Sequence, residues 1–384
     1  MASLFEIGKS GVQAYRQALS VTGQNIANIN TEGYNKRAAE ISEISGVSGG
    51  ATNVADQSGL GVRVDNIRRS FDTYLADKTR SSQSDYEKLN DFVSKLSDLE
   101  NMLLPSGSDL GIFIGRFFDS LQDVASSPES ISARIVSMEA GNALASSFNS
   151  YDKQLNDFKS SALKQTETLT KEANLYINQL AQVNSLISRS GSKDASNDIL
   201  DARDQLLLNL SKVLNFTVDY EKTGEVNVRI GDSGSGTHLV ERNKGSILTT
   251  SSDDKSISII VNKDGIKVPG TFSSGTLSGI TQFYNLVDTV VSEIDDLAQK
   301  LTTELNEIQV AGIDLNGNVG KSMFSVNSMS PKENDNNKSS LTFSLIEGDP
   351  NKIMQERVLV NYSQSNLNWE IRNSKGVSYA YGNK

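Results

Sequence analysis

The sequence predicts a mainly α fold with some β structure, built as an elongated, multi-domain rod of long coiled-coil helices. Apolar residues recur every three or four positions through most of residues 71–215 and again over 275–311, which is the spacing of helices that pack side by side. Residues 216–274 instead show short alternating runs rich in Val, Ile and Thr, and these predict a small antiparallel β module. Similar runs within residues 341–384 predict the start of an outer β domain.

Composition excludes several classes of function. The 384-residue chain has a net charge of −10, and an acidic surface repels phosphate backbones, so we expect no nucleic-acid partner. The absence of cysteine excludes disulfides, thiolate nucleophiles and cysteine-bound zinc. The N-terminus lacks the basic and apolar regions of a cleaved signal peptide, and no apolar run approaches the ~20 residues that span a bilayer, so we expect no membrane partner.

Residues 1–70 begin with a helix that needs a partner. A heptad seam of mostly small side chains runs along it, and a second apolar stripe lies beside this seam. A lone helix that is apolar on more than one face is unstable in water, although an ordinary core helix would give the same pattern. The seam residues are Leu4, Ile7, Gly11, Ala14, Ala18 and Val21, and the second stripe is Phe5, Val12, Tyr15, Leu19 and Ile26.

The segment after this helix is rich in turn-forming residues. Asn28, Asn30 and Gly33 predict a helix C-terminus that runs into an extended segment. The Gly-rich stretch 46–61 predicts a loop, and alternation over 62–67 predicts a short strand.

Residues 71–215 predict a helical rod domain. The expected helices cover 71–103, 110–125, 128–190 and 198–214, with breaks at Pro105 and at residues 191–193. Ser127, Pro128 and Glu129 have the order of an N-cap, a first-turn proline and a first-turn acid, and they place the start of the longest helix. The first of these helices carries its apolar stripe on Leu75, Tyr86, Leu89, Val93, Leu96 and Leu103.

The second half of the chain returns to the rod after the β module. Residues 275–326 predict a return helix, with its periodic part ending near Ala311, and an Asn-, Ser- and Lys-rich linker follows at 327–340. Residues 341–384 then predict the opening strands of the outer β domain.

Candidate chemical groups do not assemble into a site. His238 is the one histidine and has no second His or Cys as a partner, so an edge-strand or surface position explains it better than catalysis. Residues 231–236 lack the Lys-Ser/Thr of a phosphate loop, and residues 314–318 lack the later Gly and Glu of a calcium loop. Asp201, Arg203 and Asp204 predict a salt-bridged helix start. We therefore predict no catalytic, cofactor-binding or metal-binding residues and no enzyme activity.

One short segment resembles a known family signature. Residues 27–34 read Ala-Asn-Ile-Asn-Thr-Glu-Gly-Tyr, similar to the A-N-x-N-T-x-G-Y/F motif of flagellar rod, hook and first hook-associated proteins. The matching positions are Ala27, Asn28, Asn30, Thr31, Gly33 and Tyr34.

Three later segments resemble the hook-associated protein 1 family in particular. They lie at 117–130, 201–211 and 306–317, with Val124 where the family has Leu and Gln309 where His is usual. The resemblance runs from the start to about residue 325, and shorter rod proteins lack these middle segments. Another axial rod or hook protein is the alternative within the same class, and an exported adhesin or antigen is an alternative outside it.

The resemblance implies a flagellin-like rod and a structural role in the bacterial flagellum, at the hook–filament junction. It implies export by the flagellar type III apparatus without a cleaved signal peptide, and an extracellular location. The implied partners are further copies in a ring, the hook protein, the next hook-associated junction protein and an export chaperone. The family ends in an apolar helix that pairs with the N-terminal helix. This sequence ends in β-like residues, so we expect the partner helix and the chaperone site to be missing, residues 1 to about 35 to pack poorly, and normal polymerisation to fail.

Overall fold

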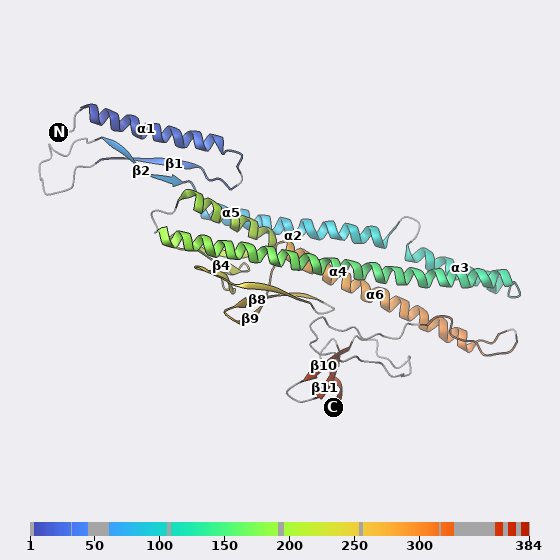
Figure 1. The fold of residues 1–384 in the computed structure, drawn as a ribbon. Helices are drawn as coiled ribbons and strands as arrows, with labels where there is room; N and C mark the ends of the chain where they lie inside the picture. The colour runs from blue at the N-terminus through green and yellow to red at the C-terminus, as the bar shows by residue number, and fades with distance from the viewer. Residues whose placement is uncertain are drawn as a thin grey trace. The chain divides into compact units, whose positions relative to one another are not determined.

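A computed structural model of the chain describes residues 4–31, 33–44, 61–105, 109–190, 196–252, 256–314, 316–325, 358–363, 368–373 and 378–383. The predicted loop over 46–60, the break at 191–193 and the linker at 327–340 lie outside these residues. The fold is mainly helical with small antiparallel sheets, which confirms the predicted fold class (Figure 1). The chain divides into two compact units, Met1–Thr303 and Glu304–Lys384, whereas the six segments expected from the sequence stay predictions.

The first helix packs on a hairpin made by the residues that follow it. Helix α1 covers Leu4–Ala27, and strands β1 (Arg37–Glu43) and β2 (Val62–Arg69) pair antiparallel with Arg37 opposite Arg69. Helix α1 contacts both strands. The sequence led us to expect poor packing of residues 1 to about 35. The hairpin covers one face of α1, whereas the second apolar stripe of the helix is exposed.

Five further helices follow the hairpin within the described residues. They are α2 (Thr73–Leu103), α3 (Leu110–Ser126), α4 (Ile131–Ser190), α5 (Asn197–Val213) and α6 (Thr276–Ala311). The side chains of Asp72, Asp109 and Ser196 cap α2, α3 and α5 by accepting a backbone N–H three residues on. The predicted start of the longest helix at Pro128 is wrong. Residues 128–129 form a turn, and α4 begins only at Ile131.

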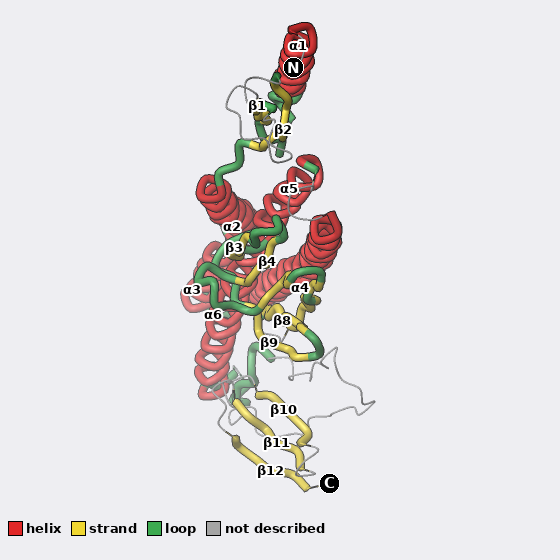
Figure 2. The backbone as a smooth tube through the Cα atoms, turned by 90° about the vertical axis from the view of Figure 1, so that its left-hand side faces the viewer, coloured by secondary structure: helices red, strands yellow, loops and turns green. Residues whose placement is uncertain are grey.

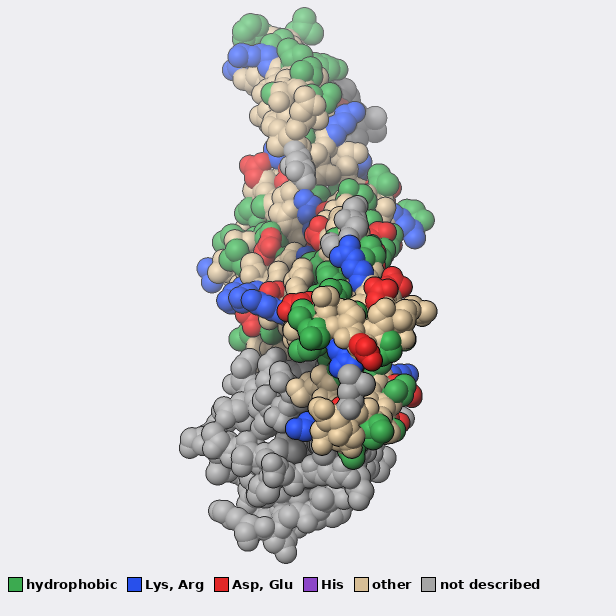
Figure 3. Space-filling view, turned by 90° about the vertical axis from the view of Figure 1, so that its right-hand side faces the viewer, with side chains coloured by type: hydrophobic (Ala, Val, Ile, Leu, Met, Phe, Trp, Pro, Cys, Tyr) green, Lys and Arg blue, Asp and Glu red, His purple; other side chains and the backbone are tan. Residues whose placement is uncertain are grey.

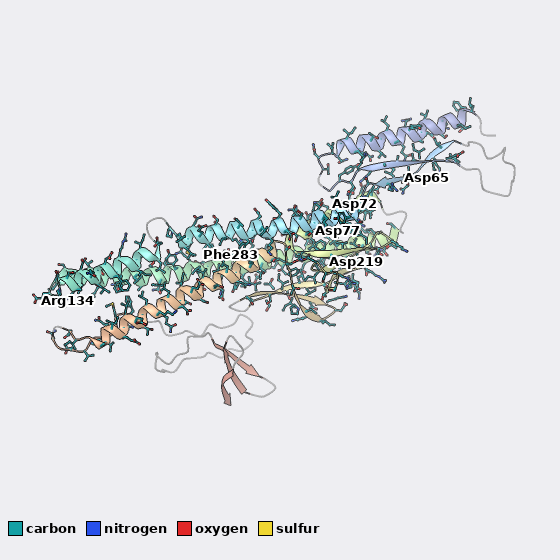
Figure 4. The ribbon with its side chains drawn as sticks, turned by 180° about the vertical axis from the view of Figure 1, so that it is seen from behind. Asp65, Asp72, Asp77, Arg134, Asp219 and Phe283 are labelled. Atoms are coloured by element: carbon teal, nitrogen blue, oxygen red, sulfur yellow. The ribbon has the colours of Figure 1, made fainter. Side chains whose placement is uncertain are left out.

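Helices α2, α4 and α6 share one apolar core. It contains Leu99 of α2, Leu155 of α4 and Phe283 of α6, which is 2% exposed (Figure 4). Phe158 packs edge-on against Phe283 with ring centroids 6.0 Å apart. Gly279 brings the backbone of α6 against that of α2, since a Cβ there would lie 2.6 Å from a carbonyl oxygen of α2.

The face of α2 that packs inward is not the one its sequence pattern suggested. Arg80, Ser84 and Leu99 are buried. The apolar stripe expected to form the seam is largely exposed: Leu75, Tyr86, Leu89 and Val93 keep about 60% of their surface open, and Leu96 keeps 37%. Gly275 and Gly279 of the α6 start pack on the polar side of α2, and this close approach decides which face is buried.

The predicted β module lies on one side of α4 (Figures 1 and 2). One sheet has the order β3-β4-β5-β6 and the other β7-β8-β9. The strands are β3 (Phe216–Tyr220), β4 (Val226–Ile230), β5 (His238–Glu241), β6 (Lys244–Gly245), β7 (Ile247–Ser252), β8 (Ile257–Lys263) and β9 (Ile266–Gly270). Their inward side chains form one core with α4 and α5, which includes Ile177, Leu180, Leu207, Val228 and Val240.

The second unit begins within α6. Asn306 bonds to the backbone of Met323 and Phe324 and so holds the segment after the helix in place. Asp314 closes the intervening turn by accepting backbone N–H groups of Asn316 and Asn318, both at 2.8 Å. Strands β10 (Val358–Ser363), β11 (Asn368–Asn373) and β12 (Ser378–Asn383) form an antiparallel meander, where the sequence predicted the outer β domain to start.

Candidate functional site

Helix α1 has two apolar faces that differ in burial. Of the seam facing the hairpin, Ala14 and Val21 are buried and Ile7, Gly11 and Ala18 are half-buried. Gly11 is not a position of close approach, since an added Cβ there would have nothing within 4 Å. Leu4 is the exception within the seam, at 88% exposed.

The second stripe of α1 is exposed among the residues that the structure describes. Its five side chains, together with Ile29, form an apolar face that we call the outer face of α1, and hydrophobic side chains gather on this part of the molecule in Figure 3. Each is at least two-thirds exposed except Val12, at 62%. An apolar surface of this extent is typical of a site that binds another protein. Its members are Phe5, Val12, Tyr15, Leu19, Ile26 and Ile29.

The signature residues form a turn that Asn25 organises. Its side-chain amide exchanges two hydrogen bonds with the backbone of Arg37: Nδ2 donates to the carbonyl at 2.8 Å, and Oδ1 accepts the N–H at 2.9 Å. The Tyr34 hydroxyl donates to the same Oδ1 at 2.9 Å. The Thr31 hydroxyl donates to the Asn28 side chain at 3.1 Å. The turn therefore folds the chain back from α1 into β1.

Gly33 is required in this turn for two reasons. Its φ of +80° lies in the left-handed region that favours glycine. A Cβ would also stand 2.1 Å from Oε1 of Gln205, so the turn packs directly on α5. A cavity of about 510 Å³ lies beside this contact and is lined by signature residues and by Asp198, Asp201 and Gln205. The other signature positions, Ala27 and Asn30, are exposed.

A charge network joins the hairpin to α5. Nη2 of Arg37 lies 2.7 Å from Asp198 and 2.8 Å from Asp201. Arg69 contacts Asp204, and its Nε lies 2.9 Å from Asp201 as a charge contact without hydrogen-bond alignment. Burial opposes the charge on Arg37 and lowers its pKa, but the bonds from the two carboxylates outweigh burial and raise that pKa overall.

Aromatic rings close the network where β2 passes into α2. Phe71 lies beneath the guanidinium groups of Arg69 and Arg203, at 5.1 Å and 5.9 Å from its centroid. Tyr220 of the β module packs edge-on against Phe71 at 5.9 Å. Asp72 then caps α2 directly after this ring (Figure 4). The connection between hairpin and helical domain is thus packed and charge-paired.

Sequence reasoning identified only part of this network. It expected Asp201, Arg203 and Asp204 to form local salt bridges, and Arg203 does pair with Asp204 at 2.7 Å. It missed Arg37 and Arg69, whose partners on α5 are more than 130 residues away in sequence. The one available signal was the presence of arginines before the predicted loop and directly after the predicted short strand.

The other candidate groups considered from the sequence, His238 and residues 231–236, lie in and between strands of the β module. His238 lies in β5 with Nδ1 3.3 Å from Nζ of Lys263, and burial with nearby Arg229 and Lys263 lowers its pKa. Residues 231–236 connect β4 to β5. Within the described ranges, no three His, Cys, Asp or Glu side chains converge as a metal site. The helices of these ranges also include none with the length and apolarity to cross a bilayer.

The helical domain identifies the family. Residues 96–324 match the model described as flagellar hook-associated protein FlgK helical domain, and residues 5–35 match the model of the flagella basal body rod protein. The first match covers more than half of the chain. The chain belongs to the flagellar hook-associated protein FlgK family. Its two matches correspond to α1 with the signature turn, and to the segment from the end of α2 to α6 with the β module.

Curated relatives extend the FlgK match over most of the chain. Flagellar hook-associated protein 1 of Escherichia coli (strain K12) is 26% identical over 382 residues, which cover 97% of this chain and 68% of the relative. The protein of the same name from Salmonella typhimurium is 27% identical over 348 residues, covering 88% and 62%. That from Bacillus subtilis (strain 168) is 24% identical, covering 83% and 69%. The chain therefore spans about two-thirds of the length of these relatives.

A solved structure supports the FlgK fold. The flagellar hook junction protein FlgK from Burkholderia pseudomallei superposes with a TM-score of 0.62 at 23% identity, covering 80% of this chain and 57% of that one. At this identity the likeness establishes the fold alone. It agrees with the order of helices and sheets described above.

Proposed function

We propose that this chain is a structural subunit of the bacterial flagellum at the hook–filament junction, with no enzymatic role. The observation that carries the proposal is the outer face of α1, an uncovered apolar surface directly before the axial signature turn. An apolar helical face seeks a partner helix in an assembly. Membership of the FlgK family and the names of its relatives supply the place of that assembly.

Under this proposal, the partners are further copies of the chain, the hook protein, the next hook-associated junction protein and an export chaperone. The chain works outside the cell after type III export without a cleaved signal peptide. Another axial rod or hook protein is less favoured, because the helical-domain match covers residues 96–324, well beyond the 31 residues (5–35) of the rod-protein match. The adhesin alternative has no feature of the described residues in its favour.

Complementation tests the proposal. In an Escherichia coli K12 strain lacking its own flagellar hook-associated protein 1, a chimaera would carry residues 1–384 in place of the aligned segment of the native protein. We expect filaments by electron microscopy and an epitope tag located between hook and filament. The untouched native protein serves as the positive control. A chimaera that reaches the medium but leaves bare hooks without the tag would contradict the junction role, and a tag along the cell surface would favour the adhesin reading.

A further inference from the structure

We propose that Asp201 is a positioning residue that fixes the signature turn and α1 on the helical domain. Its carboxylate is shared by three side chains of the hairpin segment. Nδ2 of Asn35 donates to it at 3.0 Å, Nη2 of Arg37 at 2.8 Å, and Nε of Arg69 lies at 2.9 Å. The importance of this position of α1 for assembly rests on the proposed function. The position of α1 on the helical domain does not rest on it.

Two of the three partners of Asp201 lie in the two strands of the hairpin, and Asn35 lies just before β1. Arg37 begins β1, Arg69 ends β2, and the two residues face each other in the strand register. They lie at the open end of the hairpin, where one strand connects to the signature turn and the other to α2. One carboxylate on α5 therefore holds the entry and the exit of the segment that carries α1.

The two other carboxylates of α5 in the network have narrower roles. Within the described residues Asp198 forms an ion pair with Arg37 alone, and its side chain is 82% exposed. Asp204 contacts Arg69 but also pairs with Arg203 of its own helix. Among the carboxylates of α5 that the structure describes, Asp201 alone forms ion pairs with residues of both strands.

Burial makes this contact persistent. The side chains of Arg69 and Asp201 are 5% and 14% exposed, so salt screens their attraction less than it screens a surface pair. Removing Asp201 would leave Arg37 paired with the exposed Asp198 and Arg69 paired with Asp204, so the buried arginine charges would be less well compensated. Loss of the Asp201 charge should therefore free the hairpin from α5 while the helical core, which has its own apolar contacts, stays folded.

Distance measurement between α1 and α4 tests the proposal on the full chain. The sequence has no cysteine, so the exposed pair Gln17→Cys and Lys171→Cys can carry spin labels without background. We expect one narrow distance distribution in the parent, loss of that narrow peak in Asp201→Asn, and no change in Asp198→Asn, the matched control on the same helix. Arg37→Gln removes contacts from the hairpin side and should reproduce Asp201→Asn.

Circular dichroism of the same samples separates positioning from folding. An unchanged helical content with a lost narrow peak supports the proposal. A distance distribution in Asp201→Asn and Arg37→Gln that equals the parent's would overturn it. If Asp201→Asn loses helical content, Arg37→Gln decides, since it leaves α5 intact. The junction role is judged separately by the chimaera experiment, so a failure of that role leaves the distance result standing.

Discussion

The side chain of Asn184 pairs with the backbone of Val226 as a neighbouring strand would. Its Nδ2 donates to the Val226 carbonyl at 2.7 Å and its Oδ1 accepts the Val226 N–H at 3.0 Å. Asn174 makes the same exchange with Leu248, with both distances 2.8 Å. Asparagine is suited to this contact because one amide offers both a donor and an acceptor. These two side chains attach the two sheets of the β module to α4.

Replacing Asn184 with alanine should destabilise the protein by about 1–3 kcal/mol, because a buried N–H and carbonyl lose their partners. Asn184→Ala is measured by urea unfolding followed by circular dichroism. Asn178→Ala on the same helix is the matched control, since Asn178 is exposed, and it should change stability little. Equal losses in the two variants would show that the exchange with Val226 contributes nothing.

Alanine at Gly279 should separate α6 from α2. The added Cβ would lie 2.6 Å from the carbonyl oxygen of Lys88, and backbone cannot give way there as a flexible side chain could. We expect a loss of about 1–3 kcal/mol, the usual cost of overpacking. Gly115→Ala in α3 is the control, because nothing lies within 4 Å of its added Cβ, and it should stabilise the helix by roughly 0.5–1 kcal/mol. Thermal unfolding of both variants checks the two signs.

Acidic residues on the outer face of α1 should block assembly without unfolding the chain. Tyr15 and Leu19 are 69% and 72% exposed, so Tyr15→Glu with Leu19→Glu removes no buried contact. We expect the chimaera carrying both changes to be exported and to leave hooks without filaments. Gln13→Glu with Gln17→Glu adds the same charge to exposed positions of α1 outside the outer face, and it should retain filaments. Filaments with both pairs would rule out the outer face as the assembly surface.

Protonation of His238 should lower the free energy of unfolding at acidic pH. Burial first, then the cations Arg229 and Lys263, lower its pKa below the ordinary 6.5. As pH falls through 6.5 the unfolded chain gains the proton first, so stability is complete above that pH and declines below it until the folded histidine also protonates. Urea unfolding of the parent and of His238→Gln at about pH 7.5 and about pH 5 tests this. The advantage of the parent over the variant should shrink at the lower pH, and a constant difference would contradict the assignment.

The Tyr176 hydroxyl should ionise at a higher pH than an ordinary tyrosine. Its hydroxyl donates to Glu172 at 2.7 Å, and this bond, followed by burial, raises the pKa of Tyr176 to about 12 from 10.0. An unfolded tyrosine ionises first as pH rises, so the stabilising effect is present below pH 10 and is lost between the two pKa values. Ultraviolet titration of phenolate should lose its latest step in Tyr176→Phe. Persistence of that step would assign it to another tyrosine.

The sequence predicted the helices well because their periodicity is local. The expected ranges 110–125 and 275–311 differ from α3 and α6 by one residue at each end or less. Periodicity did not determine which side of a helix is buried, as α2 shows. Its apolar stripe, including Leu89 and Val93, is exposed, because the glycines at the start of α6 pack on the opposite face.

The candidate site was predictable where it depends on a short motif and not where it depends on distant partners. The turn at Gly33 follows from a residue type that tolerates positive φ. The contacts of Asp201 with Arg37 and Arg69 could not be read locally, since only the tertiary fold brings these residues together. The seam of α1 was predicted as a stripe, and its contact with the hairpin required the structure.

Asn215 links the two ends of the β module. It stands just before β3, and its amide bonds to both the side chain and the backbone N–H of Ser273, 58 residues later, just after β9. Because the two ends of the β module are held together, the module connects α5 to α6 as a tight turn would. Contacts within the module offset the conformational entropy lost on closing this long loop. We therefore expect that residues can be inserted between β8 and β9, at the Asp264–Gly265 turn, without shifting α5 or α6. Hydrogen exchange of α6 in such an insertion variant would reveal any such shift as lost protection.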